Sequence, residues 1–233
     1  MQSNQVIQTD RIYLEQFFCG PMGNCLYLLA DPATRKAFLF DPAFEPLEFH
    51  QLAVERGFDV EAVVCTHAHQ DHVGGEIFGM HIPGLRELRN RVDLPVYIHP
   101  SEADYLVDKT GQPRESLQDL QEGAALVLGD LEIEVFHLPG HSPGGCAFLA
   151  DGHMIVGDTL FVQGVGRVDL PGSDIDQMFQ SLQRLKGMDP SIHIYPGHNY
   201  GPAASSTLGR EVDLNPYLKP SSLEQWRVMM GVF

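Results

Sequence analysis

Apolar residues along this chain gather in short runs that glycine, proline and charged residues separate. Three such runs near the start, RIYLEQFF, NCLYLLA and KAFLFD, are rich in the aromatic and branched side chains that are typical of strands. Gly20, Pro21, Gly23 and the pair Asp31-Pro32 stand where turns are expected. The pattern predicts an antiparallel meander at the beginning of the chain.

Further along, helical and strand-like patterns alternate. They predict a helix over 45–56, a buried strand at EAVVCT, a strand at LPVYIH, a helix over 101–108 and a polar loop over 109–121. Strands at ALVLG, LEIEVFHL, GCAFLA and HMIVGD follow, and then a helix over 175–186 and a last strand at SIHIYP. This alternation is typical of a layered α/β fold, and a chain of 233 residues is long enough to form one domain, residues 1–233.

Charge and composition exclude several classes of partner. Against 31 acidic residues the chain has 15 Lys and Arg, a net charge of -16, which repels both nucleic acid and anionic lipid. Neither an apolar run long enough to cross a bilayer nor a secretory signal is visible, so we expect a soluble, cytoplasmic protein. No feature indicates an oligomeric state. The scattered cysteines are expected to be buried thiols, with a disulfide between Cys19 and Cys25 as the alternative.

The segment CTHAHQDHVGG, which follows the apolar run AVVC, concentrates potential metal ligands. His67 and His69 are two residues apart, a spacing that places them on one face of a strand end, where they can converge on one ion. Asp71 and His72 follow directly, and a turn of the loop could aim them at a neighbouring point. The spacing therefore predicts one metal ion and makes a second one plausible.

Three more candidate ligands stand in loops that begin where predicted strands end. They are His141 in HLPGHSPGG, Asp158 in IVGDTLF and His198 in IYPGHNYG. Flanking glycine and proline allow the backbone to turn sharply beside a ligand. The remaining histidines have no such company and are expected to be surface or hydrogen-bonded core residues: His50, His81, His99, His137, His153 and His193.

Four segments taken in order, THAHQDHVGG, LPGHSPGG, VGDTLFVQGVGRVDLPGSD and YPGHNYG, resemble the metallo-β-lactamase-fold superfamily, and within it the hydroxyacylglutathione hydrolases (glyoxalase II). The resemblance extends from about Arg11 to Leu218. It implies a four-layer αββα sandwich with a dinuclear site at one edge of its two sheets. It further implies the ligands of metal one (His67, His69, His141), the ligands of metal two (Asp71, His72, His198) and a bridging carboxylate (Asp158).

Imidazole and carboxylate ligands without thiolate suit zinc, and also iron or manganese, and we expect two zinc ions. Two ions sharing Asp158 would share a water, lower its pKa and polarise a carbonyl oxygen. The hypothesis is ester or thioester hydrolysis by a metal-bridged hydroxide, with Asp71 also orienting this nucleophile as a catalytic residue. Asp41 resembles an aspartate of the superfamily that reaches toward the ligand loops, although Asp-Pro is also a common turn pair. Thr66 and Ser142 could hydrogen-bond ligands or act as local caps.

The resemblance also places two residues where glyoxalase II contacts glutathione, Arg167 and Tyr200, which implies a small-molecule substrate such as a glutathione conjugate. Arg167 could equally form a salt bridge with Asp169 or Asp174. Two departures weigh against glutathione: Asp169 stands where glyoxalase II has a second tyrosine, and the tail after His198 is too short and too rich in Gly, Ser and Pro to supply the helical region that helps clasp it.

Other members of the superfamily provide the alternatives. Persulfide dioxygenases bind one iron through the equivalents of His67, His141 and Asp158, while lactonases and phosphodiesterases keep all seven ligands. Asn199 before Tyr200, and the segment GRVDLPGSD, favour a hydrolase over a dioxygenase. β-Lactamases lack the bridging aspartate, and a binding module with structural zinc would need a closed site of four ligands rich in cysteine.

Overall fold

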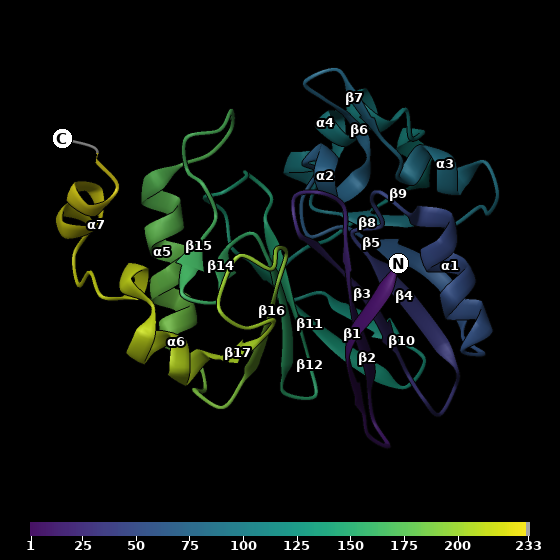
Figure 1. Ribbon diagram of the computed structural model, residues 1–233, viewed down its shortest axis with the longest axis horizontal. Helices are drawn as coiled ribbons and strands as arrows, with labels where there is room; N and C mark the ends of the chain where they lie inside the picture. Colours follow the sequence, from purple (N-terminus) through teal and green to yellow (C-terminus); the bar gives the residue numbers. More distant parts are fainter. Residues whose placement is uncertain (232–233) are drawn as a thin grey trace. The chain divides into compact units, whose positions relative to one another are not determined.

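Residues 1–231 are described by a computed structural model, in two compact units that divide after Val135. Both units combine sheets with helices, which confirms the predicted mixed α/β fold class (Figure 1). That the whole chain forms one domain stays a prediction. Among the residues described, no helix is long and apolar enough to span a bilayer.

The first unit is built on a seven-stranded sheet with the order β1-β2-β3-β4-β5-β8-β9. Its first four strands pair antiparallel, which confirms the meander predicted for the second to the fourth, and the remaining pairs are parallel. The strands are β1 (Gln2–Gln8), β2 (Tyr13–Cys19), β3 (Asn24–Ala30), β4 (Lys36–Phe40), β5 (Asp59–Val64), β8 (Val96–Ile98) and β9 (Leu117–Asp119). The polar sequence of β1 gave no strand signal, because this strand lies at the sheet edge and is largely exposed.

Helices follow the strands of the first unit. Two of the predicted helices form, as α1 (Pro46–Glu55) and α4 (Pro100–Thr110). Each has proline in its first turn, and Gly111, with a φ of 68°, ends α4 in the left-handed conformation that glycine favours. The predicted loop over 109–121 is wrong in part, because it contains a 3₁₀ turn (Arg114–Ser116) and β9, whose short length hides its strand period.

Two short helices, α2 (Gln70–Val73) and α3 (Leu85–Arg89), flank a hairpin of β6 (Gly75–Ile77) and β7 (Met80–Ile82). The base of the hairpin is a close contact of two glycines. A Cβ on Gly84 would lie 2.3 Å from the Val73 carbonyl oxygen, and one on Gly74 would lie 2.7 Å from the Gly84 Cα. Phe78 stands fully exposed at the hairpin turn. The glycine contact fixes the hairpin directly after α2.

The division between the units falls within the hairpin of β10 (Ala125–Leu128) and β11 (Leu131–His137). In the second unit β12 (Cys146–Ala150), β13 (His153–Gly157), β16 (His193–Pro196) and β17 (Ser206–Thr207) pair in that order. The predicted helix over 175–186 is α5 (Ile175–Lys186), and the Asp174 carboxylate caps it by accepting hydrogen bonds from the backbone N–H of Asp176 and Gln177. A small hairpin of β14 (Leu160–Phe161) and β15 (Gly164–Val165) completes the unit.

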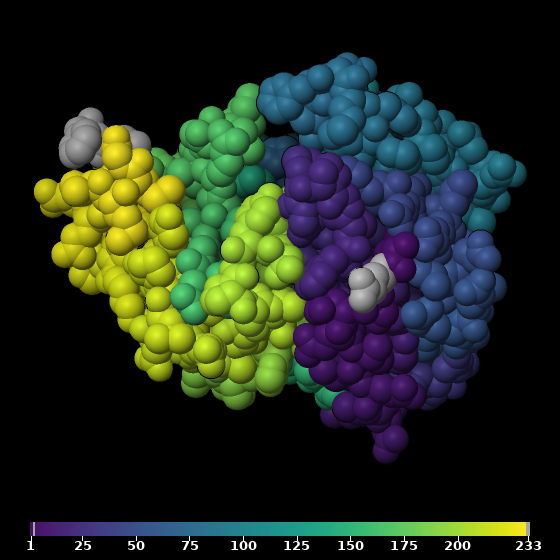
Figure 2. All heavy atoms as spheres, in the orientation of Figure 1, coloured from purple at the N-terminus to yellow at the C-terminus, as the bar shows by residue number. Residues whose placement is uncertain are grey.

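The C-terminal segment, which the sequence did not predict to be helical, contains α6 (Leu208–Leu214), a 3₁₀ turn (Pro216–Leu218) and α7 (Leu223–Met229). The buried Trp226 of α7 donates a hydrogen bond of 2.8 Å to the Ile175 carbonyl at the start of α5. Figure 2 shows this segment, in yellow, on the surface of the second unit. All four cysteines are buried free thiols, as predicted, and the alternative disulfide does not form.

Candidate metal centre

Four predicted ligands belong to the first unit and follow β5. This strand ends at Val64, and the backbone N–H of Cys65 still donates to the Tyr97 carbonyl of β8. His67 is buried in the segment beyond, His69 is the N-cap of α2, and Asp71 and His72 lie within α2. The sequence placed the first pair on a strand end, whereas the structure places them in the connection between strand and helix.

Asp41 organises this segment from the end of β4. Its carboxylate accepts hydrogen bonds from the Thr66 backbone N–H (2.8 Å) and the Thr66 hydroxyl (2.7 Å), and it lies 3.1 Å from the Nδ1 of His72. Because the Thr66 hydroxyl donates to Asp41, its oxygen can accept from the Nδ1 of His67, 3.0 Å away. With these hydrogen bonds, the imidazoles of His67 and His72 each carry their proton on Nδ1, so the lone pair of each Nε2 can bind a metal ion. Of the two roles predicted for Thr66, the structure therefore shows the hydrogen bond to a candidate ligand, His67.

The distances among these side chains are compatible with a shared metal ion. The Nε2 of His67 lies 3.0 Å from the Nδ1 of His69, and the Nε2 of His72 lies 3.4 Å from a carboxylate oxygen of Asp71. On the tautomer that Asp41 favours, the His72 contact joins two acceptors with no proton between them. Two atoms that each lie about 2.0–2.1 Å from one tetrahedral ion are roughly 3.3 Å apart. The arrangement therefore fits a divalent cation.

Two positioning contacts in this unit were not predicted from the sequence. The buried Asn24, at the start of β3, donates from Nδ2 to both the backbone carbonyl and a carboxylate oxygen of Asp71, each at 3.0 Å. The buried Glu102 of α4 accepts a hydrogen bond of 3.3 Å from the backbone N–H of Ala68, which lies between two ligands. Each pair is more than thirty residues apart in sequence, so no local motif could have indicated it.

The other three predicted ligands belong to the second unit, and all three are buried. His141 lies between β11 and β12, Asp158 follows β13, and His198 follows β16. The Nε2 atoms of His141 and His198 lie 3.5 Å and 3.2 Å from the same carboxylate oxygen of Asp158. Two imidazoles that converge on one carboxylate oxygen form a donor set that fits a divalent metal.

The loop after Asp158 fixes the orientation of His141. The Nδ1 of His141 lies 2.9 Å from the backbone carbonyl oxygen of Arg167, and donating to it directs Nε2 toward Asp158 as a possible ligand atom. This loop approaches so closely that a Cβ on Gly166 would lie 1.9 Å from the Asp158 carbonyl oxygen and 3.0 Å from the Nδ1 of His141. Only glycine fits at this position. Ser142 is buried, and its hydroxyl has no hydrogen-bond partner among the residues described, so neither of its predicted roles is seen.

The two predicted substrate contacts differ in their surroundings. Arg167 forms a bidentate salt bridge with Asp169, at 2.8 Å and 2.9 Å, and both side chains are exposed. Of the two partners that the sequence allowed, Asp174 is instead the cap of α5. The ring of Tyr200 is 61% exposed and stacks on the imidazole of His198, with ring centroids 4.5 Å apart. Tyr200 therefore offers an accessible aromatic face beside a candidate ligand.

A sequence profile of the Metallo-beta-lactamase superfamily matches residues 20–77 and 81–198, most of the chain. The chain belongs to this superfamily. The match includes all seven predicted ligands, and each of the seven belongs to a group of side chains that could hold a metal ion. The resemblance read from the four sequence motifs is confirmed at the level of the superfamily.

Relatives within the metallo-β-lactamase superfamily have different activities. The chain is 32% identical over 219 residues to the Bacillus subtilis protein named "Probable metallo-hydrolase YqgX", covering 88% of this chain and 96% of that one. It is 30% identical to hydroxyacylglutathione hydrolase GloC of Haemophilus influenzae, covering 85% and 94%. It is 28% identical to the mitochondrial persulfide dioxygenase ETHE1 of Bos taurus, covering 94% and 80%. These similarities support a metal-dependent enzyme and leave its specific reaction open.

Solved structures of the superfamily match the fold over most of the chain. ETHE1 from Myxococcus xanthus superposes with a TM-score of 0.79 at 26% identity, covering 94% of this chain and 89% of that chain. The crystal structure of TTHA1623 in a di-iron-bound form gives a TM-score of 0.72 at 33% identity, covering 87% and 99%. The metallo-β-lactamase fold is thereby confirmed for this chain.

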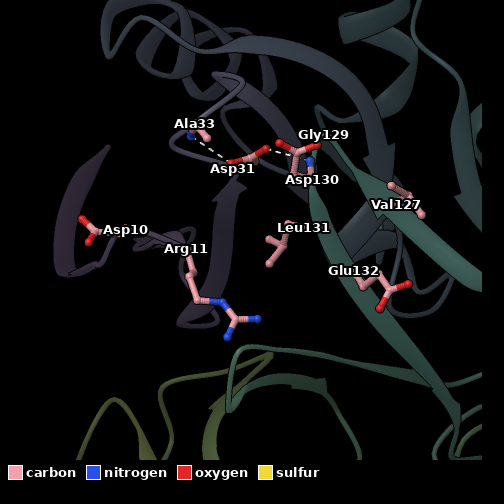
Figure 3. Close-up of a pocket in the computed structure, with 9 residues that line it drawn as sticks. All are labelled: Asp10, Arg11, Asp31, Ala33, Val127, Gly129, Asp130, Leu131 and Glu132. Atoms are coloured by element: carbon pink, nitrogen blue, oxygen red, sulfur yellow. Dashed lines mark hydrogen bonds between the residues drawn. The ribbon is translucent and has the colours of Figure 1, made fainter.

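A hollow of about 480 Å³ lies elsewhere on the first unit, and none of the predicted ligands lines it. Figure 3 shows Asp31 at its wall, bonded to the backbone N–H of Ala33 and of Asp130. Burial raises the pKa of Asp31, but the hydrogen bonds from Asp130 and from the Thr34 hydroxyl outweigh burial and hold this pKa below its usual value. The carboxylate is thus used within the protein to tie the β10–β11 turn to the turn after β3, and we assign this hollow no ligand.

Proposed function

We propose that this chain is a dinuclear metal-dependent hydrolase that cleaves a thioester or ester of a small molecule. The seven ligands are His67, His69 and His141 for one ion, Asp71, His72 and His198 for the other, and Asp158 for both. One observation carries the proposal: His67, His72 and His141 each have their Nδ1 hydrogen-bonded within the protein, and each has its Nε2 beside a donor atom of another candidate ligand. Zinc is the metal we propose, although the same donors suit iron or manganese.

The protein's own groups have definite tasks in such a reaction. Bound divalent metal would supply a Lewis acid and a water whose pKa is lowered toward neutrality. Asp71 offers a carboxylate oxygen that can accept the proton of an attacking water and orient it, while Asn24 holds that carboxylate in place by its two hydrogen bonds. Asp158 is buried, and its negative charge compensates the positive charge of the ions.

For the substrate we propose a hydroxyacyl thioester of glutathione or of a similar thiol. Support comes from the similarity to GloC and from the exposed ring of Tyr200 beside His198. Arg167 can bind a substrate carboxylate only after its salt bridge with Asp169 opens. An exposed pair of this kind contributes little to stability, so a substrate carboxylate could displace Asp169.

A second candidate is a persulfide dioxygenase with one iron held by His67, His141 and Asp158. The observation in its favour is the similarity to ETHE1, both in sequence and in the solved structure from Myxococcus xanthus. In that case Asp71 and His72 would stand beside the iron without holding an ion of their own.

Metal analysis of the purified chain, with two parallel activity assays, separates the two reactions. The proposal predicts two metal ions per chain and turnover of S-D-lactoylglutathione, both lost in the variant Asp158→Ala. One iron per chain, with oxygen uptake in the presence of glutathione persulfide, would establish the second candidate instead. Full thioester turnover by Asp158→Ala would refute the role of this carboxylate.

A further inference from the structure

Two buried polar residues of the second unit lie outside every ligand motif and contact the hairpin that follows Asp158. Glu211 lies in α6 and Asn215 directly follows that helix, and both are fully buried, with exposures of 0%. The Nδ2 of Asn215 donates to a carboxylate oxygen of Glu211 at 3.0 Å. A buried carboxylate is costly to keep in a protein unless strong hydrogen bonds compensate it, so its contacts call for an explanation.

These contacts converge on the turn of the β14–β15 hairpin. The same oxygen of Glu211 accepts a hydrogen bond of 2.6 Å from the backbone N–H of Gln163, whose φ is 59°. Asn215 donates to the backbone carbonyls of Gly164 (3.0 Å) and Phe161 (3.3 Å). The backbone N–H and carbonyl groups of exposed turns usually form hydrogen bonds with water, whereas here they bond to two side chains of the C-terminal segment. The pair Glu211–Asn215 therefore acts as a clamp on this hairpin.

The clamped hairpin is linked to each of the three candidate ligands in its unit, by a ring contact or through the chain on either side of it. It begins two residues after Asp158 and leads into the segment whose Arg167 carbonyl bonds His141. The ring of Phe161 meets the imidazole of His198 edge-on, with centroids 5.8 Å apart and planes at 82°. It meets Tyr200 in the same way at 5.4 Å. A shift of the turn would therefore move all three ligands relative to one another.

We propose that Glu211 and Asn215 are positioning residues for the metal ligands, because they set the place of the β14–β15 hairpin on which His141, Asp158 and His198 depend. This inference rests on the proposed function only in assuming that these ligands hold metal, whichever reaction follows. Neither residue was assigned a role from the sequence.

The test replaces the carboxylate while preserving its volume. Glu211→Leu removes the acceptor for Gln163 and Asn215, whereas Glu211→Gln keeps one oxygen that can accept both hydrogen bonds. Trp226→Phe is the matched control in the same unit, because it removes a buried hydrogen bond of 2.8 Å between α7 and α5 without touching the hairpin. Asn215→Ala gives a second route to loosening the hairpin if Glu211→Leu does not fold.

Each full-length protein is stripped of metal and titrated with Co²⁺, whose visible absorption reports ligand geometry, and with Zn²⁺ against a chromophoric chelator. Thermal unfolding of the metal-free protein is measured in parallel. We expect Glu211→Leu or Asn215→Ala to bind Zn²⁺ about 10-fold more weakly and to change the Co²⁺ spectrum, while Glu211→Gln stays close to wild type. Trp226→Phe should lower the unfolding temperature and leave both metal readouts unchanged.

Two results would overturn the inference: wild-type metal affinity and Co²⁺ spectrum in the Glu211→Leu and Asn215→Ala proteins, or a loss of affinity in Trp226→Phe that matches its loss of stability. Failure of the proposed hydrolase reaction would be recognised separately, since a wild-type protein that binds metal but does not cleave thioesters leaves these titrations intact.

Discussion

Replacing Asp41 by asparagine changes one acceptor oxygen into a donor and tests how the ligand imidazoles are held. The oxygen that accepts from the Thr66 backbone N–H can be kept by the amide, which places the new NH₂ group against the Thr66 hydroxyl and the Nδ1 of His72. Asparagine also tolerates the positive φ of 51° at this position, so the substitution adds little backbone strain.

The new NH₂ group leaves His72 two choices, and both weaken the site. If the imidazole keeps its tautomer, two buried N–H groups face each other. If it changes tautomer, the proton moves to Nε2, the atom that we assign to the metal. Loss of a hydrogen bond to a charged group is worth about 1.5–3 kcal/mol. Since about 1.4 kcal/mol corresponds to a factor of ten, metal affinity should fall roughly 10- to 100-fold.

The assay is competition for Zn²⁺ between the metal-free protein and a chelator, together with thermal unfolding of the metal-free protein. Asp31→Asn is the matched control, because Asp31 is also a buried aspartate at a strand end and accepts three hydrogen bonds, but it lies away from the ligands. Both variants should lose stability, and only Asp41→Asn should lose metal affinity. Equal affinity in the wild type and Asp41→Asn would refute the assignment of the His72 tautomer to Asp41.

Three more predictions follow from contacts near and away from the ligands. Gly166→Ala forces a Cβ against the Asp158 carbonyl and should abolish binding of at least one metal ion, measured by metal content. Gly187→Ala is the control and should bind metal as the wild type does, because a Cβ there would meet only ordinary contacts. Equal metal content in both variants would contradict the packing argument. Asn24→Ala should leave metal bound but lower thioester turnover roughly 10- to 100-fold, because the Asp71 carboxylate loses its donor, and unchanged turnover would remove Asn24 from the mechanism. Burial, and then the facing His193, lower the pKa of His153 below its usual 6.5, so the folded state favours the neutral form of His153. The stability that this group contributes is therefore complete above pH 6.5 and decreases as the pH falls below that value. Unfolding temperatures of the metal-free protein from about pH 7.5 to about 5.5 should therefore fall less steeply in His153→Gln, and parallel curves would contradict this.

Sequence reasoning identified the features whose signal is local. The strands β2, β3 and β4 and the helices α1, α4 and α5 follow from short runs of residues with a clear period, and the ligand motifs lie at the ends of predicted strands. In each unit the candidate ligands of that unit lie together in the structure. That they bind metal stays a prediction.

The features that sequence reasoning missed depend on distant contacts or on weak patterns. Asn24 was predicted only as the first residue of a strand, because its contact with Asp71 spans 47 residues. Glu211 was given no role from the sequence, because its contact with Gln163 spans 48 residues. The helices α6 and α7, of seven residues each, are too short to show a clear helical period. Each begins at a cap, Thr207 or Ser222, whose side chain accepts a hydrogen bond from the backbone of the first turn.

The glycine contact at the base of the β6–β7 hairpin has a consequence for the evolution of substrate range. Gly74 and Gly84 close the hairpin directly after the helix that carries Asp71 and His72, so the hairpin begins and ends at this contact. Segments of other lengths and compositions between positions 76 and 81 can be exchanged there without altering the backbone that presents the ligands. The hairpin is thus a modular position in the chain, at which selection or a designed library could change the surface around Phe78 while the metal-binding chemistry stays the same.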